Sequence, residues 1–503
     1  MAVIVKAGET HSAFAGRRKI FIDAEEINRD NIEKVVSEVL AIHSKNAEEI
    51  QYLIDYERGI TPIQRRDKEG REDIDYRINE NHASEIKTFK VGYVFSTPIT
   101  LAQRAVEDNG QSDTDDKRIA RLNEMLYEQK KAAKDKKLAE DFSICGVGYR
   151  MALPKQKAGV GVAPFDILPL NPLTTCVAYS NDVYQRRMLG ISYVVKADGT
   201  TKIGVYTDDY YYALEGSEFG GTLHLVGEPK VNGIGIVPIV EYRADEQRMG
   251  CFERALDLLD ALCILTSDRV NGLSQFVQNI LWADNVILDE SQKQEVKAGG
   301  WLFTKSDGAT KATIQYLTQQ LDQTSAQSLV DWTYEQILQI TGTPARGKST
   351  GGNTGQAIVL SNGWTIAETA AKNTETVFKD SEMDFLEVIL RILARDKNVD
   401  EELKTLRLSD IEIKLGRNKT DSILVKVQAL QQLIETGVDP LTSFKTVDLF
   451  SDPQQVFVDS KKYIEEKRNY GKVENDRGNP VVQREQSGAD SQRQNGQVQE
   501  SYS

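Results

Sequence analysis

Residues 251–282, CFERALDLLDALCILTSDRVNGLSQFVQNILW, decide the fold class of this chain. Their apolar residues, from Phe252 to Leu281, recur at helical spacing, and the stretch contains no proline. A helix of roughly thirty residues, rising about 1.5 Å per residue, is a rod of about 45 Å. Because this exceeds the average helix of a globular protein, the stretch predicts an architectural strut.

A small strand-rich insert follows the long helix, and the chain then returns as a second helix. NVIL (285–288) and WLFTK (301–305) are typical of strands, and residues 306–308 form a turn into ATIQYL (312–317). An amphipathic pattern over 322–340 predicts the second helix. The insert is therefore predicted to lie at the tip of a helical hairpin.

The first half of the chain combines helices and strands. Helical spacing predicts helices over 30–56, 83–95 and 114–142. Two segments, ADGTT (197–201) and VNGIG (231–235), are of the kind that connects hairpins. From residue 146 to about 242, short β-branched and aromatic runs predict one antiparallel sheet, in the order ISYVVKA, KIGVYT, YYYAL, LHLVG and IVPIVEY. The expected fold class is α+β, mainly helical.

The chain after the hairpin is again predicted to be helical. A glycine-rich loop, GTPARGKSTGGNTG (342–355), precedes a third long helix over 356–395, with a kink at Asn362-Gly363. Short helical segments follow Asn398. From about Lys472 the chain has almost no apolar residues, which predicts a disordered tail.

Charge and composition exclude several classes of protein. The 503 residues carry a formal net charge of −14, whereas a protein that grips DNA through its phosphates has a basic excess. Any DNA contact is therefore expected to be loose or confined to a small part of the surface. No apolar run is long enough for a membrane helix, and MAVIVKAGETHSAFAGRRKIF at the start lacks a signal peptide's apolar region. We expect a cytosolic protein with no membrane partner.

The cysteines and histidines show no metal-binding spacing. No C-x-x-C pair is present, and the four histidines complete no zinc pattern. We expect no metal and no cofactor. The cysteines are expected to be buried free thiols in a reducing compartment, namely Cys145, Cys176, Cys251 and Cys263.

Residues 342–349, GTPARGKS, match the pattern G-x-x-x-x-G-K-[ST] of phosphate-binding loops. In such a loop Lys348 would contact the β- and γ-phosphates and Ser349 a magnesium ion. That site needs a buried strand before the loop and a helix directly after it. Here an amphipathic segment precedes Gly342 and more loop follows Ser349. The stretch is better interpreted as a glycine-rich excursion that carries two cations, Arg346 and Lys348.

Other catalytic patterns are missing. The sequence has no G-x-S-x-G elbow and no H-E-x-x-H motif, and four histidines leave few candidates for acid–base chemistry. We therefore expect no catalytic residues and no enzyme. The large aromatic residues are expected to anchor the core or a subunit interface, and they are Trp282, Trp301, Trp332 and Trp364.

The order of these parts resembles the portal protein family of tailed bacteriophages, in particular the branch that infects Gram-positive bacteria. The similarity spans about residues 50–470, and the ordered set of segments carries it. These segments are INENHASEIKTFKVGYVFSTPIT (78–100), SICGVGYRMAL (143–153), the proline-containing stretch 167–179, VYTDDYYYAL (205–214), GIVPIVEYRADEQRMGCFERALDLLDALCILTSD (235–268) and GNTGQAIVLSNGW (352–364).

The resemblance implies an elongated portal fold assembled as a ring around a central channel. Its parts are a wing, a stem, a clip and a crown. Carried onto this chain they are the wing (1–248), with antiparallel strands over about 146–242, a first stem helix (249–284), the clip (285–321), a second stem helix (322–341), a tunnel loop (342–355), a long kinked wing helix (356–396), a helical crown (397–475) and the disordered tail (476–503).

The resemblance also implies a function and partners. The ring, dodecameric in the virion, is a homo-oligomer at the portal vertex of the capsid, and it is assembled in the host cytoplasm. Double-stranded DNA enters through it during packaging and leaves through it during ejection. Implied partners are the terminase large subunit, a head-completion or adaptor protein, the scaffolding protein and the major capsid protein.

Two sets of site residues follow from this assignment. Contact with DNA should be independent of base sequence, because phosphates carry no base information. The tunnel-loop residues expected at the DNA backbone are Arg346, Lys348, Ser349 and Asn353. The clip residues expected to dock partners are Trp301, Phe303, Lys305 and Asp307.

Two other readings stay open beside the portal. One is a P-loop NTPase, such as a packaging motor, that uses GTPARGKS at 342–349. The other is a different phage head or connector protein that shares only local similarity.

Overall fold

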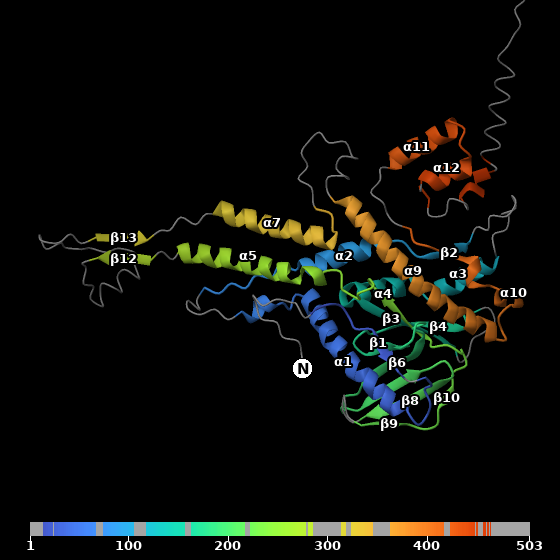
Figure 1. Ribbon diagram of the computed structural model, residues 1–503. Helices are drawn as coiled ribbons and strands as arrows, with labels where there is room; N and C mark the ends of the chain where they lie inside the picture. The colour runs from blue at the N-terminus through green and yellow to red at the C-terminus, as the bar shows by residue number, and fades with distance from the viewer. Residues whose placement is uncertain are drawn as a thin grey trace, which may run out of the picture. The chain divides into compact units, whose positions relative to one another are not determined.

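The computed structural model divides the chain into two compact units, Met1–Lys419 and Thr420–Ser503. The residues it describes are 14–23, 25–66, 74–104, 117–155, 162–216, 222–277, 280–284, 313–317, 323–345, 363–416, 423–447, 449–450, 456–458, 460–461 and 463. Figure 1 shows the elements of both units. Within the described ranges no helix is long and apolar enough to cross a membrane.

The larger sheet of the first unit has seven strands and lies against the helix α1 (Ile32–Glu57). Its strands are β1 (Ile20–Ile22), β5 (Thr175–Ser180), β6 (Arg187–Val195), β7 (Thr201–Tyr206), β8 (Tyr210–Gly216), β9 (Leu223–Leu225) and β10 (Lys230–Val231). β1 pairs with β5 in parallel, and the other pairs are antiparallel.

The predicted hairpin at residues 197–201 is confirmed. The Lys196 N–H donates to the Thr200 carbonyl oxygen over 2.9 Å, and Gly199 adopts a φ of +84° between β6 and β7. A positive φ suits glycine because it lacks a Cβ.

The predicted single sheet and the predicted hairpin at residues 231–235 are wrong. A second sheet of three strands, in the order β11–β3–β4, stands beside the first. Its strands are β3 (Val147–Pro154), β4 (Phe165–Leu170) and β11 (Ile239–Arg243). The Asn232 side chain donates to the carbonyl oxygens of Thr207 and Ile236, over 2.7 and 2.9 Å. The turn therefore carries the chain from one sheet to the other, since β10 pairs with β8 and β11 pairs with β3.

Four helices contribute to the core that lies on the three-stranded sheet. They are α2 (His82–Val94), α3 (Lys117–Glu128), α4 (Lys131–Cys145) and α9 (Trp364–Arg395). The predicted helices over 30–56 and 83–95 are confirmed as α1 and α2. The predicted helix over 114–142 is two helices, because Lys130 takes a left-handed φ of +52° between α3 and α4.

The long helix that begins the hairpin is shorter than predicted. A 3-10 turn, η2 (Glu253–Ala255), leads into α5 (Leu256–Val277), and residues 280–284 form the strand β12 (Ile280–Asp284) where the helix was predicted to continue. β12 pairs antiparallel with β13 (Thr313–Leu317), which confirms the predicted strand over 312–317. This ladder supplies the backbone hydrogen bonds that a longer helix would have made.

The return helix is confirmed as α7 (Gln323–Thr341), which packs on α5. The predicted strands at 285–288 and 301–305 lie outside the described residues. So do residues 356–362 of the predicted third helix, whose described part begins at Trp364, and the tail 476–503.

The stretch after α9 is not wholly helical, and part of it belongs to the first unit. After α10 (Glu401–Lys404) and η3 (Leu408–Asp410), β14 (Ile411–Lys414) pairs antiparallel with β2 (Thr100–Gln103). Near the start of the chain, between α1 and α2, lies another 3-10 turn, η1 (Pro62–Arg65). In the second unit the predicted helices are present as α11 (Ile423–Glu435) and α12 (Pro440–Val447). The unit boundary falls after Lys419 and not near residue 397.

A buried cluster of charges joins α4, β3, β11 and α9. Arg150 forms ion pairs with Asp135, over 2.5 Å, and with Glu382. Lys131 lies 2.6 Å from Asp135 and 3.0 Å from Glu382, and the Tyr242 hydroxyl donates to Glu382 over 2.7 Å. Two cations and two carboxylates balance, which is the condition under which such charges are tolerated in a core.

The cysteines are free thiols, as predicted, and three of the four are buried, while Cys251 is half-buried. Burial raises the pKa of Cys251 to about 12 and that of Cys263 to about 11. Protonated thiols at neutral pH are poor nucleophiles and poor metal ligands.

Candidate functional site at the base of the 342–355 loop

The eight residues predicted as site residues lie outside the described part of the structure. They are Arg346, Lys348, Ser349, Asn353, Trp301, Phe303, Lys305 and Asp307. The structure does describe both ends of the glycine-rich loop, through Ala345 on one side and from Gly363 on the other. The site is therefore built from the residues that hold these two ends.

The loop begins at a helix C-terminus. The Gly342 N–H donates to the Gln339 carbonyl oxygen over 3.1 Å, and the Thr343 N–H donates to the Leu338 carbonyl oxygen over 2.8 Å. Gly342 itself has a φ of +61°. This pair of bonds with a left-handed glycine is the Schellman motif, which ends α7. The first glycine of GTPARGKS is thus a helix cap, and the element before it is a helix and not a strand.

Helix α2 holds this cap from the side. The Lys90 ammonium donates to the Gly342 carbonyl oxygen over 3.2 Å. A cation at this place also faces the negative end of the α7 dipole. Burial lowers the pKa of Lys90, because the charged ammonium is partly removed from water.

The same helix holds the other end of the loop. The Tyr93 hydroxyl donates to Glu368 Oε2 over 2.7 Å. The rings of Phe89 and Tyr93 are stacked, with centroids 5.5 Å apart, and the Trp364 ring lies 6.0 and 5.8 Å from them. Trp364 is the first residue of α9, so α2 fixes the start of that helix as well as the end of α7.

The two ends also approach each other. Gly363 has a φ of +77°, and a Cβ placed on it would lie 3.9 Å from the Pro344 Cα. Figure 1 shows α2 beside the end of α7 and the start of α9. We call the set Lys90, Tyr93, Gly342, Trp364 and Glu368 the loop base.

A cavity of about 570 Å³ opens beside the loop base. Its lining includes Phe95, Phe142 and Val377, with Ile340 and Ile366 at the two helix ends. The other wall is the connection from β11 to η2, residues 244–251. A cavity of this size is large enough to accept side chains from a binding partner.

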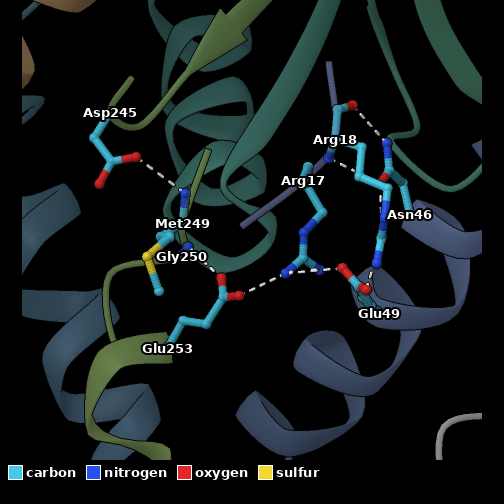
Figure 2. Close-up of polar contacts among 8 residues, drawn as sticks. All are labelled: Arg17, Arg18, Asn46, Glu49, Asp245, Met249, Gly250 and Glu253. Carbon is cyan, nitrogen blue, oxygen red and sulfur yellow. Dashed lines mark hydrogen bonds and ion pairs between the residues drawn. The ribbon is translucent and has the colours of Figure 1, made fainter. Parts of the chain in front are cut away.

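That wall is braced by the N-terminal segment, as Figure 2 shows. Arg17 pairs with Glu253 over 2.5 Å and with Glu49 of α1 over 3.3 Å. Glu253 accepts the Gly250 N–H over 2.8 Å. All three ionic side chains are buried, so Arg17 joins the connection that leads into α5 to helix α1, through a charge-assisted hydrogen bond to Glu253 and an ion pair with Glu49.

The helical hairpin itself is acidic. α5 and α7 carry Asp257, Asp260, Asp268, Asp331 and Glu335, against one cation, Arg269. Four of these carboxylates are exposed, and Asp260 is buried, where it accepts the Tyr56 hydroxyl over 2.7 Å. Such a surface repels the phosphates of nucleic acid.

The loop base holds the two ends of the loop through hydrogen bonds and ring contacts. In the described ranges, no cluster of His, Cys, Asp and Glu is arranged to hold a metal ion. Sequence reasoning missed Lys90, Tyr93 and Glu368. Lys90 reads as an ordinary solvated lysine of a helix, and its partner Gly342 lies 252 residues away, so no local signal marks it.

Comparisons with known proteins identify the family. No curated protein sequence matches this chain. The family described as phage portal protein, SPP1 Gp6-like, matches residues 36–470, which include every described residue of α5, α7 and the loop base. This chain belongs to the phage portal protein family, as its sequence predicted.

Proposed function

We propose that copies of this chain form the ring channel at one capsid vertex, through which DNA is packaged and later ejected. The family match supports this proposal, since portal proteins are structural components of the phage head. In the proposed assignment α5 and α7 are the stem helices, residues 285–321 the clip, residues 342–355 the tunnel loop, and α11 and α12 part of the crown. Residues 397–416 go with the wing, because β14 pairs with β2.

The observation that carries the DNA-channel proposal is the loop base. Lys90, Tyr93 and Trp364 brace both ends of the loop, while Arg346 and Lys348 are the cations between those ends. A braced loop of this kind can present a few cations to a passing phosphate backbone, with Ser349 and Asn353 as further hydrogen-bond partners. The contact is independent of base sequence and few cations make it, so DNA can slide.

The acidic hairpin supports sliding in the same way. Exposed carboxylates such as Asp331 and Glu335 give the phosphates no binding site along α5 and α7. A channel that held DNA by many cations would oppose its motion, because each phosphate contact releases counterions and adds to affinity.

We also propose the partners that the family suggests. The clip, with Trp301, Phe303, Lys305 and Asp307, docks the terminase large subunit during packaging and a head-completion or adaptor protein afterwards. The scaffolding protein and the major capsid protein surround the ring as it is built in the host cytoplasm, before it resides in the virion.

Imaging of the purified chain tests this function against the two alternatives. A ring with a central hole is expected in negative-stain micrographs, with one subunit number after symmetry analysis. A P-loop NTPase would instead bind ATP, and the Lys348→Ala variant would no longer bind it. The helix cap at Gly342 argues against such binding, because a phosphate loop follows a strand. A chain that forms no ring and binds no ATP would favour another head or connector protein.

A further inference from the structure

The cavity beside the loop base is rich in aromatic side chains. Phe89, Tyr93, Phe95 and Phe142 all line it. The Phe89 and Tyr93 rings are stacked, with centroids 5.5 Å apart, and the Phe95 and Phe142 rings meet edge to face, with centroids 5.7 Å apart. Such rings offer flat apolar surfaces on which another aromatic ring can pack. At about 570 Å³ the cavity also lies within the size range of small-molecule sites.

Four charged side chains line the same cavity, and three of them have a partner of opposite charge. Asp245 pairs with Arg254 over 2.8 Å, and both belong to the lining. Glu246 pairs over 3.1 Å with Arg243, which does not line the cavity. The fourth charged side chain is Lys90. The two lining carboxylates are therefore already neutralised, and the cation of Lys90 is left over.

The charge of Lys90 is compensated only in part. Within the described ranges its ammonium donates to the neutral carbonyl oxygen of Gly342, over 3.2 Å, and pairs with no carboxylate. The end of α7 supplies about half an elementary charge. The neighbouring Cys251 supplies none at neutral pH, because burial raises the pKa of its thiol to about 12. Keeping such a cation partly out of water costs free energy, and perturbed charges of this kind mark candidate binding sites when they line a cavity.

The Lys90 ammonium can serve a ligand without leaving the loop base. An ammonium has three N–H donors, and the Gly342 carbonyl oxygen accepts one of them. Lys90 follows Phe89 on α2, so the cation and an aromatic ring line the cavity side by side. An anion that enters the cavity would accept a charge-assisted hydrogen bond, which is stronger than a bond between neutral groups.

We propose that this cavity binds a small aromatic acid, that is, an aromatic ring system carrying one carboxylate or sulfonate. The ring packs against Phe89 and Tyr93, and the anionic group accepts a hydrogen bond from Lys90. A single negative charge matches the one cation that is left over. A phosphate monoester such as a nucleotide carries nearly two charges at neutral pH, and the second would face Asp245 and Glu246. The site does not depend on ring assembly, since all its residues belong to one chain.

Two fluorescent probes of nearly the same shape test the site by titration of the purified chain. 8-Anilinonaphthalene-1-sulfonate carries one sulfonate, and N-phenyl-1-naphthylamine lacks it. We expect the wild type to bind the sulfonate at least about 10-fold more tightly than the neutral probe, because only the sulfonate accepts a charge-assisted hydrogen bond. Lys90→Met should make the two affinities equal. Lys87→Met is the matched control and should bind as the wild type does, since Lys87 pairs with Glu57 over 3.0 Å and does not line the cavity.

A second variant locates the bound probe. Ala370 of α9 lines the cavity, so Ala370→Trp should fill it and weaken the binding of both probes at least severalfold, with unchanged helical circular dichroism. Equal affinity of the wild type for the two probes would overturn the proposal. So would a preference for the sulfonate that survives Lys90→Met, or binding that Ala370→Trp leaves unchanged. Each of these outcomes leaves the portal function standing.

Discussion

The Lys90 ammonium and the Gly342 carbonyl oxygen lie 3.2 Å apart and join helix α2 to the end of α7. Two residues 252 positions apart thereby fix where the glycine-rich loop begins. Since α2 also holds Trp364 and Glu368 at the start of α9, one helix sets both ends of the loop.

Lys90→Met should impair DNA packaging more than it impairs folding. The lost hydrogen bond and the removed desolvation of the ammonium offset each other, so the free energy of unfolding should change by no more than about 1 kcal/mol. The released loop end should nevertheless lower the DNA packaged per head severalfold, measured as nuclease-protected DNA. Lys87→Met is the control, because Lys87 lies on the same helix and pairs with Glu57 over 3.0 Å, away from the loop. Equal packaging by the two variants would contradict the positioning role.

Gly342→Ala should destabilise the protein by about 1–2 kcal/mol, because alanine is strained at a φ of +61°. Space is not the cause, since the nearest atoms to a Cβ there lie 3.4 Å away or farther. Gly342→Asn should lose less stability than Gly342→Ala, because asparagine tolerates the left-handed region better than alanine does. Gly92→Ala in α2 is the control and should stabilise by about 0.5–1 kcal/mol, because that glycine sits in a helix with open space around it. Chemical denaturation of the wild type and the three variants gives the order of their free energies of unfolding.

The double variant Arg346→Ala, Lys348→Ala tests the DNA contact. We expect rings of normal size, because neither substitution changes a residue of the loop base. Packaging should be impaired, and the impairment should not depend on the base sequence of the DNA. Heads that fill with DNA as the wild type does would show that these cations make no needed contact.

Glu382→Gln should destabilise the first unit by about 3–5 kcal/mol, because Arg150 and Lys131 would then outnumber Asp135 in a buried cluster. Burial raises the pKa of Glu382, but Arg150 and Lys131 outweigh it and lower the pKa from 4.5 to about 2. A lowered carboxyl pKa gives stability that is fully present above about pH 4.5 and is lost as the pH falls towards 2. The difference between wild type and variant, from urea unfolding at each pH, should shrink over that window. A difference that stays constant would contradict the ionised state of Glu382.

His43 should make the wild type less stable between about pH 6.5 and pH 4. Burial lowers the pKa of His43 to about 4, although its ring nitrogen lies 3.2 Å from the Leu173 carbonyl oxygen. In the unfolded chain the imidazole takes up a proton near pH 6.5, so falling pH favours unfolding by up to about 3 kcal/mol. His43→Phe should reduce the dependence of the free energy of unfolding on pH. The reduction should correspond to the uptake of up to one proton fewer on unfolding. The Leu173 carbonyl keeps a partner there, because the Tyr193 hydroxyl donates to it over 2.9 Å. An unchanged slope would refute the assignment.

Much of the fold could be predicted where the signal is local. α1 and α7 are amphipathic over many turns, and the β6–β7 hairpin has its turn residues in sequence. The family resemblance was also confirmed, because it rests on an ordered set of segments along most of the chain. In each of these cases the information lies within a few residues or accumulates along the chain.

The errors arise where a distant partner decides the structure. Residues 280–284 are a short apolar run that fits a helix or a strand equally well, and pairing with β13 makes it a strand. β14 is only four residues long, and its partner β2 lies far upstream. VNGIG reads as a hairpin, yet its flanking strands join different sheets. The loop base was missed for the same reason, because its members come from α2, α7 and α9.

The buried pair of Arg150 and Glu382 sets an order for biosynthesis. Glu382 is made 232 residues after Arg150, and at about 5–20 residues per second a ribosome needs roughly 10–50 s to reach it. Until then Lys131 and Arg150 face Asp135 alone, and their excess charge opposes closure of the core around β3. A nascent chain therefore completes the core of its first unit only when α9 has left the ribosome.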